Sequence, residues 1–142
     1  MEYKIIKTLS DLPSEMILQA LDDLKKCEDS PAYHIDMSSW HSDISGKCHV
    51  CLAGSVIAQR TDIPPSEEVS PADFYQYNET LYNKLCALDS FRHGRIEEGL
   101  KALGINKPES VASYKEITQY STEISVYVSR EKFFKDCLLY TS

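Results

Sequence analysis

The tetrapeptide Cys48-His49-Val50-Cys51 has the residue types and the spacing that most directly suggest chemistry. Two cysteines separated by two residues occur in zinc knuckles and in dithiol redox sites. A structural zinc site needs four ligands, and no second Cys or His pair at that spacing follows. His41 and His49, or the distant Cys86 with His93, would have to complete it. A dithiol redox site normally lies in a βαβ pattern, which the neighbouring sequence lacks. A zinc-binding domain is therefore the third hypothesis for this chain, and we expect no stoichiometric metal and no cofactor.

A catalytic thiol is the second use that these residues suggest. Several cysteine hydrolases place the nucleophile at the N-terminus of a buried helix, where the helix dipole lowers the thiol pKa. Cys48 or Cys51 could occupy such a position, and a histidine would have to accept the thiol proton. His34, His41, His49 and His93 are all available and the sequence selects none of them, so we take His41, which precedes the motif, as the candidate. The alternative functional hypothesis is a small cysteine-dependent hydrolase or transferase. Free cysteine is also among the most buried residue types, so the competing interpretation makes both thiols core residues.

An acidic segment that carries several tyrosines suggests binding instead of a reaction. Aromatic side chains bury much area at small entropic cost and are enriched at protein interfaces. The same tyrosines could equally close the hydrophobic core beneath the acidic loop. The surface that we expect to bind a partner contains Glu67, Glu68, Asp73, Tyr75, Tyr77 and Tyr82. The leading hypothesis is a non-enzymatic protein that acts by protein–protein contact.

The net charge of the chain favours a basic partner. The formal charge of −7 is uneven, because residues 1–47 and 48–80 contribute −4 each and residues 81–142 contribute +1. Binding to nucleic acid needs clustered Lys and Arg that displace counterions from the phosphates. We therefore expect no direct contact with nucleic acid, and a partner that is itself a basic or nucleic-acid-binding protein. An acidic surface that serves only solubility is the competing interpretation.

The length and the hydropathy of the chain indicate one domain outside the membrane. A chain of 142 residues can bury a sizeable core, and no linker divides residues 1–142. The longest apolar run is far shorter than the roughly 18 residues that a membrane span needs, and the first residues lack the apolar core of a secretory signal. We expect no membrane contact, a cytoplasmic location and reduced cysteines.

Apolar spacing and helix-capping residues predict a mainly α fold of four or five packed helices. An α+β arrangement with a small two- or three-stranded sheet is the alternative. The expected helices cover residues 13–28, 48–60, 70–94 with a break near Asn78, and 96–104. Ser10 or Asp11 should cap the first helix. Residues 33–37 are either a short strand or an extended loop, residues 42–47 form a turn, and residues 61–70 form a surface loop.

The region beyond Pro108 and the N-terminal residues are less regular. Ile124, Val126 and Val128 alternate as a strand would, while Ser129 could cap a last helix. Residues 3–8 fit either an edge strand or an irregular lead-in.

Several other residues have a structural interpretation. Gly54 should let a neighbouring helix approach the second expected helix closely, so that a bulky substitution there is costly. Arg60, at the end of that helix, and the adjacent acids Asp22 and Asp23 should face solvent. Trp40 either lines a pocket with Asp43 or covers the central helix.

The order of several packing residues resembles a group of small uncharacterised proteins of tailed bacteriophages. The pattern consists of Trp40, then Cys48-x-Val50-Cys51-x-Ala53-Gly54-Ser55-Val56-x-Ala58, then Leu85-x-x-Leu88-x-x-Phe91-Arg92-x-Gly94, and it spans residues 15–104. The resemblance implies no activity. It implies a setting, the cytoplasm of an infected bacterium, and a phage accessory protein that binds and modulates a host protein.

Overall fold

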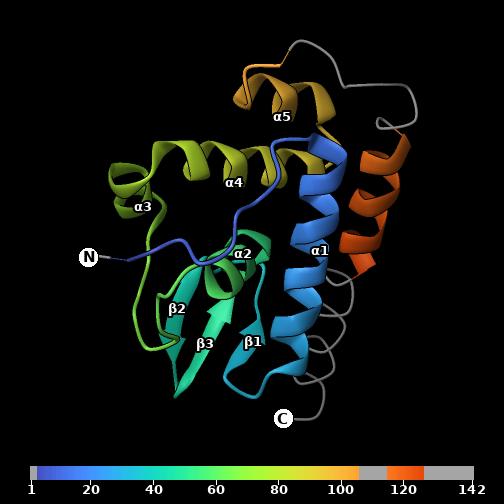
Figure 1. Ribbon diagram of the computed structural model, residues 1–142. Coiled ribbons are helices and arrows are strands. Elements are labelled where there is room, and N and C mark those ends of the chain that lie inside the picture. The colour runs from blue at the N-terminus through green and yellow to red at the C-terminus, as the bar shows by residue number, and fades with distance from the viewer. Residues whose placement is uncertain (1–2, 106–114, 127–142) are drawn as a thin grey trace.

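The computed structural model describes residues 3–105 and 115–126 and shows packed helices with one small sheet at the lower end of the molecule (Figure 1). The elements are α1 (Pro13–Asp29), β1 (Tyr33–Ile35), β2 (His41–Ile44), β3 (Lys47–Val50), α2 (Leu52–Arg60), α3 (Pro71–Tyr77), α4 (Glu79–Arg92) and α5 (Ile96–Ala102). Residues 115–126 form a further helix. The predicted mainly α class with a small sheet is confirmed. Within the described residues, no helix has the length and apolar character that a membrane crossing requires.

Helix α1 lies within one residue of its predicted bounds because Pro13 starts it and its apolar residues share one face. Met16, Ile17, Ala20, Leu21 and Leu24 are all buried. The predicted cap was wrong, because the N-cap residue is Leu12 and no side chain caps the helix. Ser10 instead accepts a hydrogen bond from the Leu12 amide through its hydroxyl oxygen.

The central helix is shorter than predicted. The apolar run from Cys48 to Arg60 is divided between strand β3 and helix α2, which begins only at Leu52. Such a run does not distinguish a buried strand from a buried helix by periodicity alone. Gly54 of α2 does permit a close approach of another segment, but that segment is the backbone at Trp40 and not a neighbouring helix. A Cβ atom at Gly54 would lie 1.5 Å from the carbonyl oxygen of Trp40, which leads into β2.

Strands β2 and β3 form a hairpin where the sequence predicted only a turn. Ser45 and Gly46, with φ of 54° and 85°, make the two-residue connection, and positive φ at both positions is typical of a type I′ turn. Strand β3 is central, antiparallel to β2 and parallel to β1. The short strand predicted within residues 33–37 is therefore confirmed, and it completes a three-stranded sheet.

The helices after the loop follow local signals in the sequence. The Ser70 hydroxyl accepts the Asp73 amide and caps α3, and the Asn78 side chain accepts the Leu81 amide and caps α4. The predicted break near Asn78 is therefore confirmed. Gly94 and Gly104, with φ of 76° and 73°, follow α4 and α5 as the left-handed residues that commonly end helices.

Residues 115–126 correct the strand that we predicted around Ile124. They are helical, and the spacing of Ile117, Ser121 and Ile124 places these three buried residues on one face. The Ser121 hydroxyl donates a hydrogen bond to the Phe91 carbonyl of α4. Val128 and the expected helix after Ser129 lie outside the described residues.

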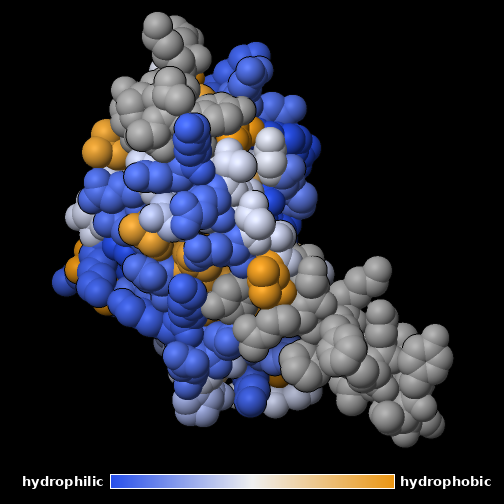
Figure 2. All heavy atoms as spheres, turned by 90° about the vertical axis from the view of Figure 1, so that its right-hand side faces the viewer, coloured by the Kyte–Doolittle hydropathy of each residue, from blue (hydrophilic) through white to orange (hydrophobic). Residues whose placement is uncertain are grey.

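One main hydrophobic core joins the helices, and a smaller cluster lies beneath the sheet. The main core is formed by the inner faces of α1, α2, α4 and α5 and by Ile117 and Ile124 of the last described helix. Cys27, Cys48 and Val50 form the smaller cluster between α1 and β3. The face of the molecule at the right of Figure 1, turned toward the viewer in Figure 2, is mainly hydrophilic with scattered apolar spots.

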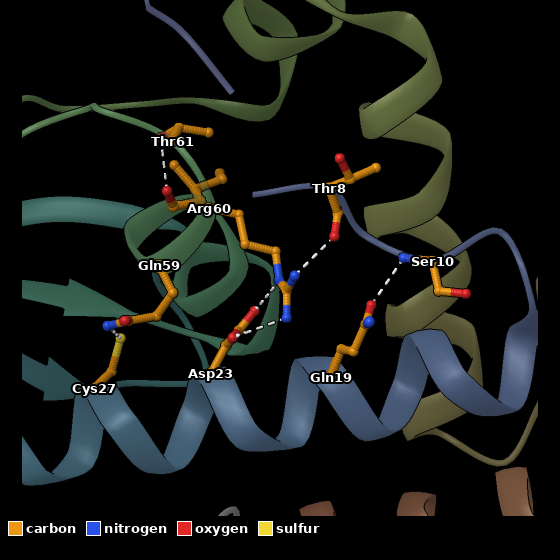
Figure 3. A network of polar contacts seen from close by, with 9 residues as sticks. Thr8, Ser10, Gln19, Asp23, Cys27, Gln59, Arg60 and Thr61 are labelled. Atoms are coloured by element: carbon orange, nitrogen blue, oxygen red, sulfur yellow. Dashed lines mark hydrogen bonds and ion pairs between the residues drawn. The ribbon is translucent and has the colours of Figure 1, made fainter. Parts of the chain in front are cut away.

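A buried ion pair joins α1 to the end of α2 (Figure 3). The Arg60 guanidinium donates to Asp23 through Nε at 2.7 Å and Nη2 at 3.3 Å, and through Nη1 to the Thr8 carbonyl at 2.9 Å. Asp23 is only 1% exposed and Arg60 only 8% exposed. The expectation that both residues face solvent was therefore wrong, and only Asp22 of the adjacent acids is exposed.

We predict that Gly54→Ala destabilises the protein. In an unobstructed helix this change gains about 1 kcal/mol through helix propensity. Here the added methyl group overlaps the Trp40 carbonyl, so we expect a net loss of about 2 kcal/mol, and a larger loss for Gly54→Leu. Urea unfolding followed by circular dichroism measures the difference, and a variant as stable as the wild type would contradict the packing described for Gly54.

We predict that Asp23→Ala costs about 3 to 5 kcal/mol, because it leaves the buried Arg60 charge without its carboxylate. Asp22→Ala is the matched control, since it removes the neighbouring exposed carboxylate and should change stability by no more than about 0.5 kcal/mol. Equal losses in the two variants would show that the ion pair does not hold the helices together.

Candidate functional site

The two cysteines of the Cys48-His49-Val50-Cys51 motif belong to different parts of the interior. Cys48 lies on β3 and packs against Cys27 and Val50, whereas Cys51 is the residue before α2 and packs in the main core. Strand β3 ends between them. The structure therefore does not bring the two thiols into one site.

Neither thiol has the environment of a nucleophile. Burial, and secondarily the nearby Cys27, raise the pKa of Cys48 to about 11. Cys51 does occupy the helix N-terminus that the thiol hypothesis required, and the amides of Gly54 and Ala53 favour its thiolate. Burial outweighs them, and the pKa of Cys51 is raised above 9.0. Both thiols keep their protons near neutral pH, which opposes the hydrolase hypothesis.

His41 does not act on either thiol in this structure. Its Nδ1 lies 2.7 Å from the Glu67 carbonyl oxygen, to which it donates, and its buried Nε2 has no partner among the described residues. Burial lowers the pKa of His41 below 6.5. No hydrogen bond joins His41 to Cys48 or Cys51 within the described residues. His41 therefore holds the loop before α3 against strand β2.

The four residues of the metal hypothesis do not converge. His49 lies on the open face of the sheet, whereas Cys48 and His41 are buried on the other face. Across residues 3–105 and 115–126, no group of three or more His, Cys, Asp or Glu side chains could hold a metal ion. The absence of a bound metal remains a prediction that elemental analysis of the purified protein can check.

An aspartate–histidine pair on the open face of the sheet was not anticipated from the sequence. His49 Nδ1 lies 3.1 Å from Asp36 Oδ2, and the Ser38 amide and hydroxyl donate to Asp36 Oδ1. The rings of His34 and His49, which are register neighbours, lie 4.7 Å apart. Ser42 is the register neighbour of His49 on β2, yet no hydrogen bond joins the two side chains. The pair fixes the turn that follows β1.

The tyrosines of the predicted partner surface gather around α3. Tyr75 and Tyr77 are 46% and 49% exposed, the values of side chains that contribute a large apolar area to the surface. Tyr82 on α4 is half-buried and lies 5.1 Å from Tyr75, measured between ring centroids. The structure therefore pairs Tyr75 with Tyr82, whereas the ring of Tyr77 lies against Tyr3 at 6.1 Å between ring centroids.

An aromatic cluster fixes α3 to the rest of the protein. Phe74 is the one buried residue of α3, and its ring centroid lies 5.4 Å from that of Tyr3 and 6.2 Å from that of Trp40. The ring centroids of Trp40 and Tyr82, and those of Tyr3 and Tyr77, are also 6.1 Å apart. The exposed tyrosines are thus held on a rigid base, a contribution of Tyr3 and Trp40 that sequence analysis did not reveal.

The predicted acids lie in the loop before α3 and in its first turn. Glu68 and Asp73 are exposed, and neither forms an ion pair with a described residue. Glu67 is half-buried, and its carbonyl oxygen accepts the His41 hydrogen bond. The Glu67 carboxylate also forms no ion pair with a described residue, so Glu68 and Asp73 differ from it in being exposed to a partner.

A groove of about 490 Å³ separates the start of β2 from the loop before α3. Its walls include Ser39, Trp40 and Ser42 on one side and Glu68, Val69 and Asp73 on the other. Trp40 therefore does line a pocket, as one of its two interpretations proposed, but Asp43 is not part of it. Tyr77 follows Asp73 by one helical turn and so lies on the same side of α3, and we call the groove together with Tyr77 the α3 face.

We predict that the buried thiols of the native protein resist alkylation at pH 8. With a pKa of about 11, only about one Cys48 thiol in a thousand is ionised at that pH. Among the four cysteines of the described residues, iodoacetamide should modify the half-buried Cys86 first, and Cys27, Cys48 and Cys51 only after urea is added. Peptide mass mapping gives the order, and labelling of Cys51 as fast as Cys86 would revive the thiol hypothesis.

We predict that His41 makes stability fall at mildly acidic pH. Burial lowers the pKa of His41 below 6.5 in the folded protein. Just below that pH, the unfolded chain therefore binds a proton at His41 that the folded chain does not bind. Stability is therefore full above about pH 6.5 and is lost as pH falls toward the lower pKa of the folded state, by at most about 1.4 kcal/mol per pH unit. Between pH 7 and pH 5, the urea midpoint of His41→Asn should depend less on pH than that of the wild type. The control His34→Gln, at an exposed site, should show the same pH dependence as the wild type.

Comparisons with known proteins give no relative from which a function could be carried over. No family model, no curated protein and no solved structure matches the chain. The function of this chain must therefore be argued from its own residues, and the α3 face combines an exposed aromatic ring, unpaired carboxylates and a groove.

Proposed function

We propose that this chain is a non-enzymatic binding protein whose α3 face contacts a basic protein. The observation that carries the proposal is the exposure of Tyr77 one helical turn from the unpaired carboxylate of Asp73, with the exposed Glu68 lining the same groove as Asp73. Tyrosines held on a rigid base bury area in an interface at little entropic cost, and such residues commonly supply most of the affinity. The carboxylates at the rim speed the encounter with a positive surface.

The partner in this proposal is a host protein in an infected bacterium. The motivation is the resemblance of residues 15–104 to small phage proteins, together with the formal charge of −7. A host protein that binds nucleic acid presents the kind of basic surface that the α3 face complements. Occupying that surface would block the nucleic acid, which is how an accessory protein without catalytic residues could modulate its target.

The thiol hypothesis is the weaker alternative. It needs an ionised nucleophile and a base in contact with it, and the described residues provide neither for Cys48 or Cys51. Burial in two separate apolar clusters accounts for both residues without a reaction.

The test compares capture of a partner from bacterial lysate by immobilised wild type and by two variants with equal changes in charge. The face variant carries Glu68→Lys and Tyr77→Ala, and the control carries Glu97→Lys on α5, whose side chain is also exposed. We expect the face variant to bind the partner at least about tenfold more weakly, because an interface tyrosine and a complementary charge are both lost. The control should bind as the wild type does.

Salt provides a second measurement on the same captured protein. Exposed charges are screened over about 8 Å at physiological ionic strength, so retention of the partner should fall as salt rises. Equal capture by the face variant and the control, or a catalytic activity that Cys51→Ser abolishes, would overturn the proposal.

A further inference from the structure

The groove of the α3 face has walls that are fixed on both sides. On the strand side, the Val69 amide donates to the His41 carbonyl oxygen at 2.9 Å, and His41 Nδ1 donates to the Glu67 carbonyl oxygen at 2.7 Å. On the helix side, the Ser70 hydroxyl caps α3. These bonds hold the loop against the edge of the sheet, so the groove is formed before a ligand binds. Binding therefore costs little conformational entropy of the loop.

The chemistry of the walls suits a cation that donates several hydrogen bonds. Glu68 and Asp73 supply carboxylates without ion pairs to described residues, and Ser42 also lines the groove. Trp40 is a further lining residue, and an aromatic ring attracts cations through the negative charge density on its faces. An anionic ligand would meet both carboxylates and is therefore disfavoured.

The N-terminus of α3 also borders the groove and by itself would repel a cation. Its effect is limited, because the helix has only seven residues and Asp73 already lies in its first turn. Glu68 then adds a full negative charge that nothing described on the surface neutralises. The balance of charge in the groove is negative.

We infer that the groove seats an arginine side chain of the protein partner, with its guanidinium between the Glu68 and Asp73 carboxylates and against Trp40. The inference rests on the proposed function and names the residue of the partner that it would recognise. Arginine fits better than lysine because its planar group donates to two carboxylates at once and stacks on an aromatic ring, whereas the lysine ammonium is a compact and strongly hydrated charge.

Trp40 makes the groove directly observable. It is the only tryptophan of the chain, so fluorescence excited at the red edge of the absorption band and the indole N–H signal in NMR both report on this wall. The probes are three pentapeptides, Gly-Ser-Xaa-Ser-Gly with blocked ends, in which Xaa is arginine, lysine or citrulline. Citrulline has the shape of arginine without its charge.

We expect the arginine peptide to shift the Trp40 signals saturably, with a dissociation constant on the order of 1 mM, and to bind about fivefold or more tightly than the citrulline peptide. The lysine peptide should lie between them. Glu68→Gln should weaken arginine binding by about two- to fivefold, and Glu97→Gln, which removes an exposed carboxylate of α5 outside the groove, should leave it unchanged. Glu68 is exposed, so its substitution leaves the fold intact.

Equal binding of arginine and citrulline peptides, or equal effects of Glu68→Gln and Glu97→Gln, would overturn the arginine site. The proposed function has a separate readout. If the peptides do not discriminate while the face variant still loses its partner, the arginine site fails and the binding face stands. If the arginine peptide behaves as expected while the face variant and its control capture the partner equally, the groove stands and the proposed function fails.

Discussion

Arg60 brings a positive charge into the interior, and the fold must supply acceptors for it. Asp23 and the Thr8 carbonyl receive the guanidinium, which ties α1, α2 and the N-terminal segment at one point (Figure 3). The backbone carbonyl of Arg60 accepts the amides of Ile6 and Lys7 as well. A buried charge that lost these partners would cost several kcal/mol, so the three segments hold one another in place. The loop that leads to Glu68 starts from this anchored point.

Much of the helical structure was predictable because its signals are local. Ser70 with Pro71, Asn78 and Gly94 each mark a helix boundary by capping or by a positive φ, and the structure confirms all three. The hairpin was missed because its strands are only four residues long, and β3 continues into an apolar helix without a break in composition. Residues 115–126 were misread because Ile124 and Val126 alternate, although Ile117, Ser121 and Ile124 already had helical spacing.

The candidate site was foreseeable only in part, for a related reason. The acids and tyrosines of residues 67–82 are close in sequence, so their composition revealed a surface. The Trp40 wall of the groove comes from a segment almost thirty residues earlier, and the Arg60–Asp23 pair joins residues with a sequence separation of 37. One amino-acid sequence contains no local signal for contacts at such distances. Burial of the thiols was likewise invisible in the cysteine spacing, and it reversed the helix-dipole effect expected at Cys51.

The central strand of the sheet, β3, is the last of the three in the sequence, and this sets an order of assembly during synthesis. Both β1 and β2 pair only with β3 among the described strands, so each leaves the ribosome before its partner exists. The β2–β3 hairpin closes through a two-residue turn, an event that takes on the order of microseconds, whereas β1 must close a longer loop. The hairpin therefore offers a template, and β1 docks onto it afterwards. Asp36 reaches His49 only in that later step, so the segment that carries Trp40 becomes anchored at both ends only when the sheet is complete.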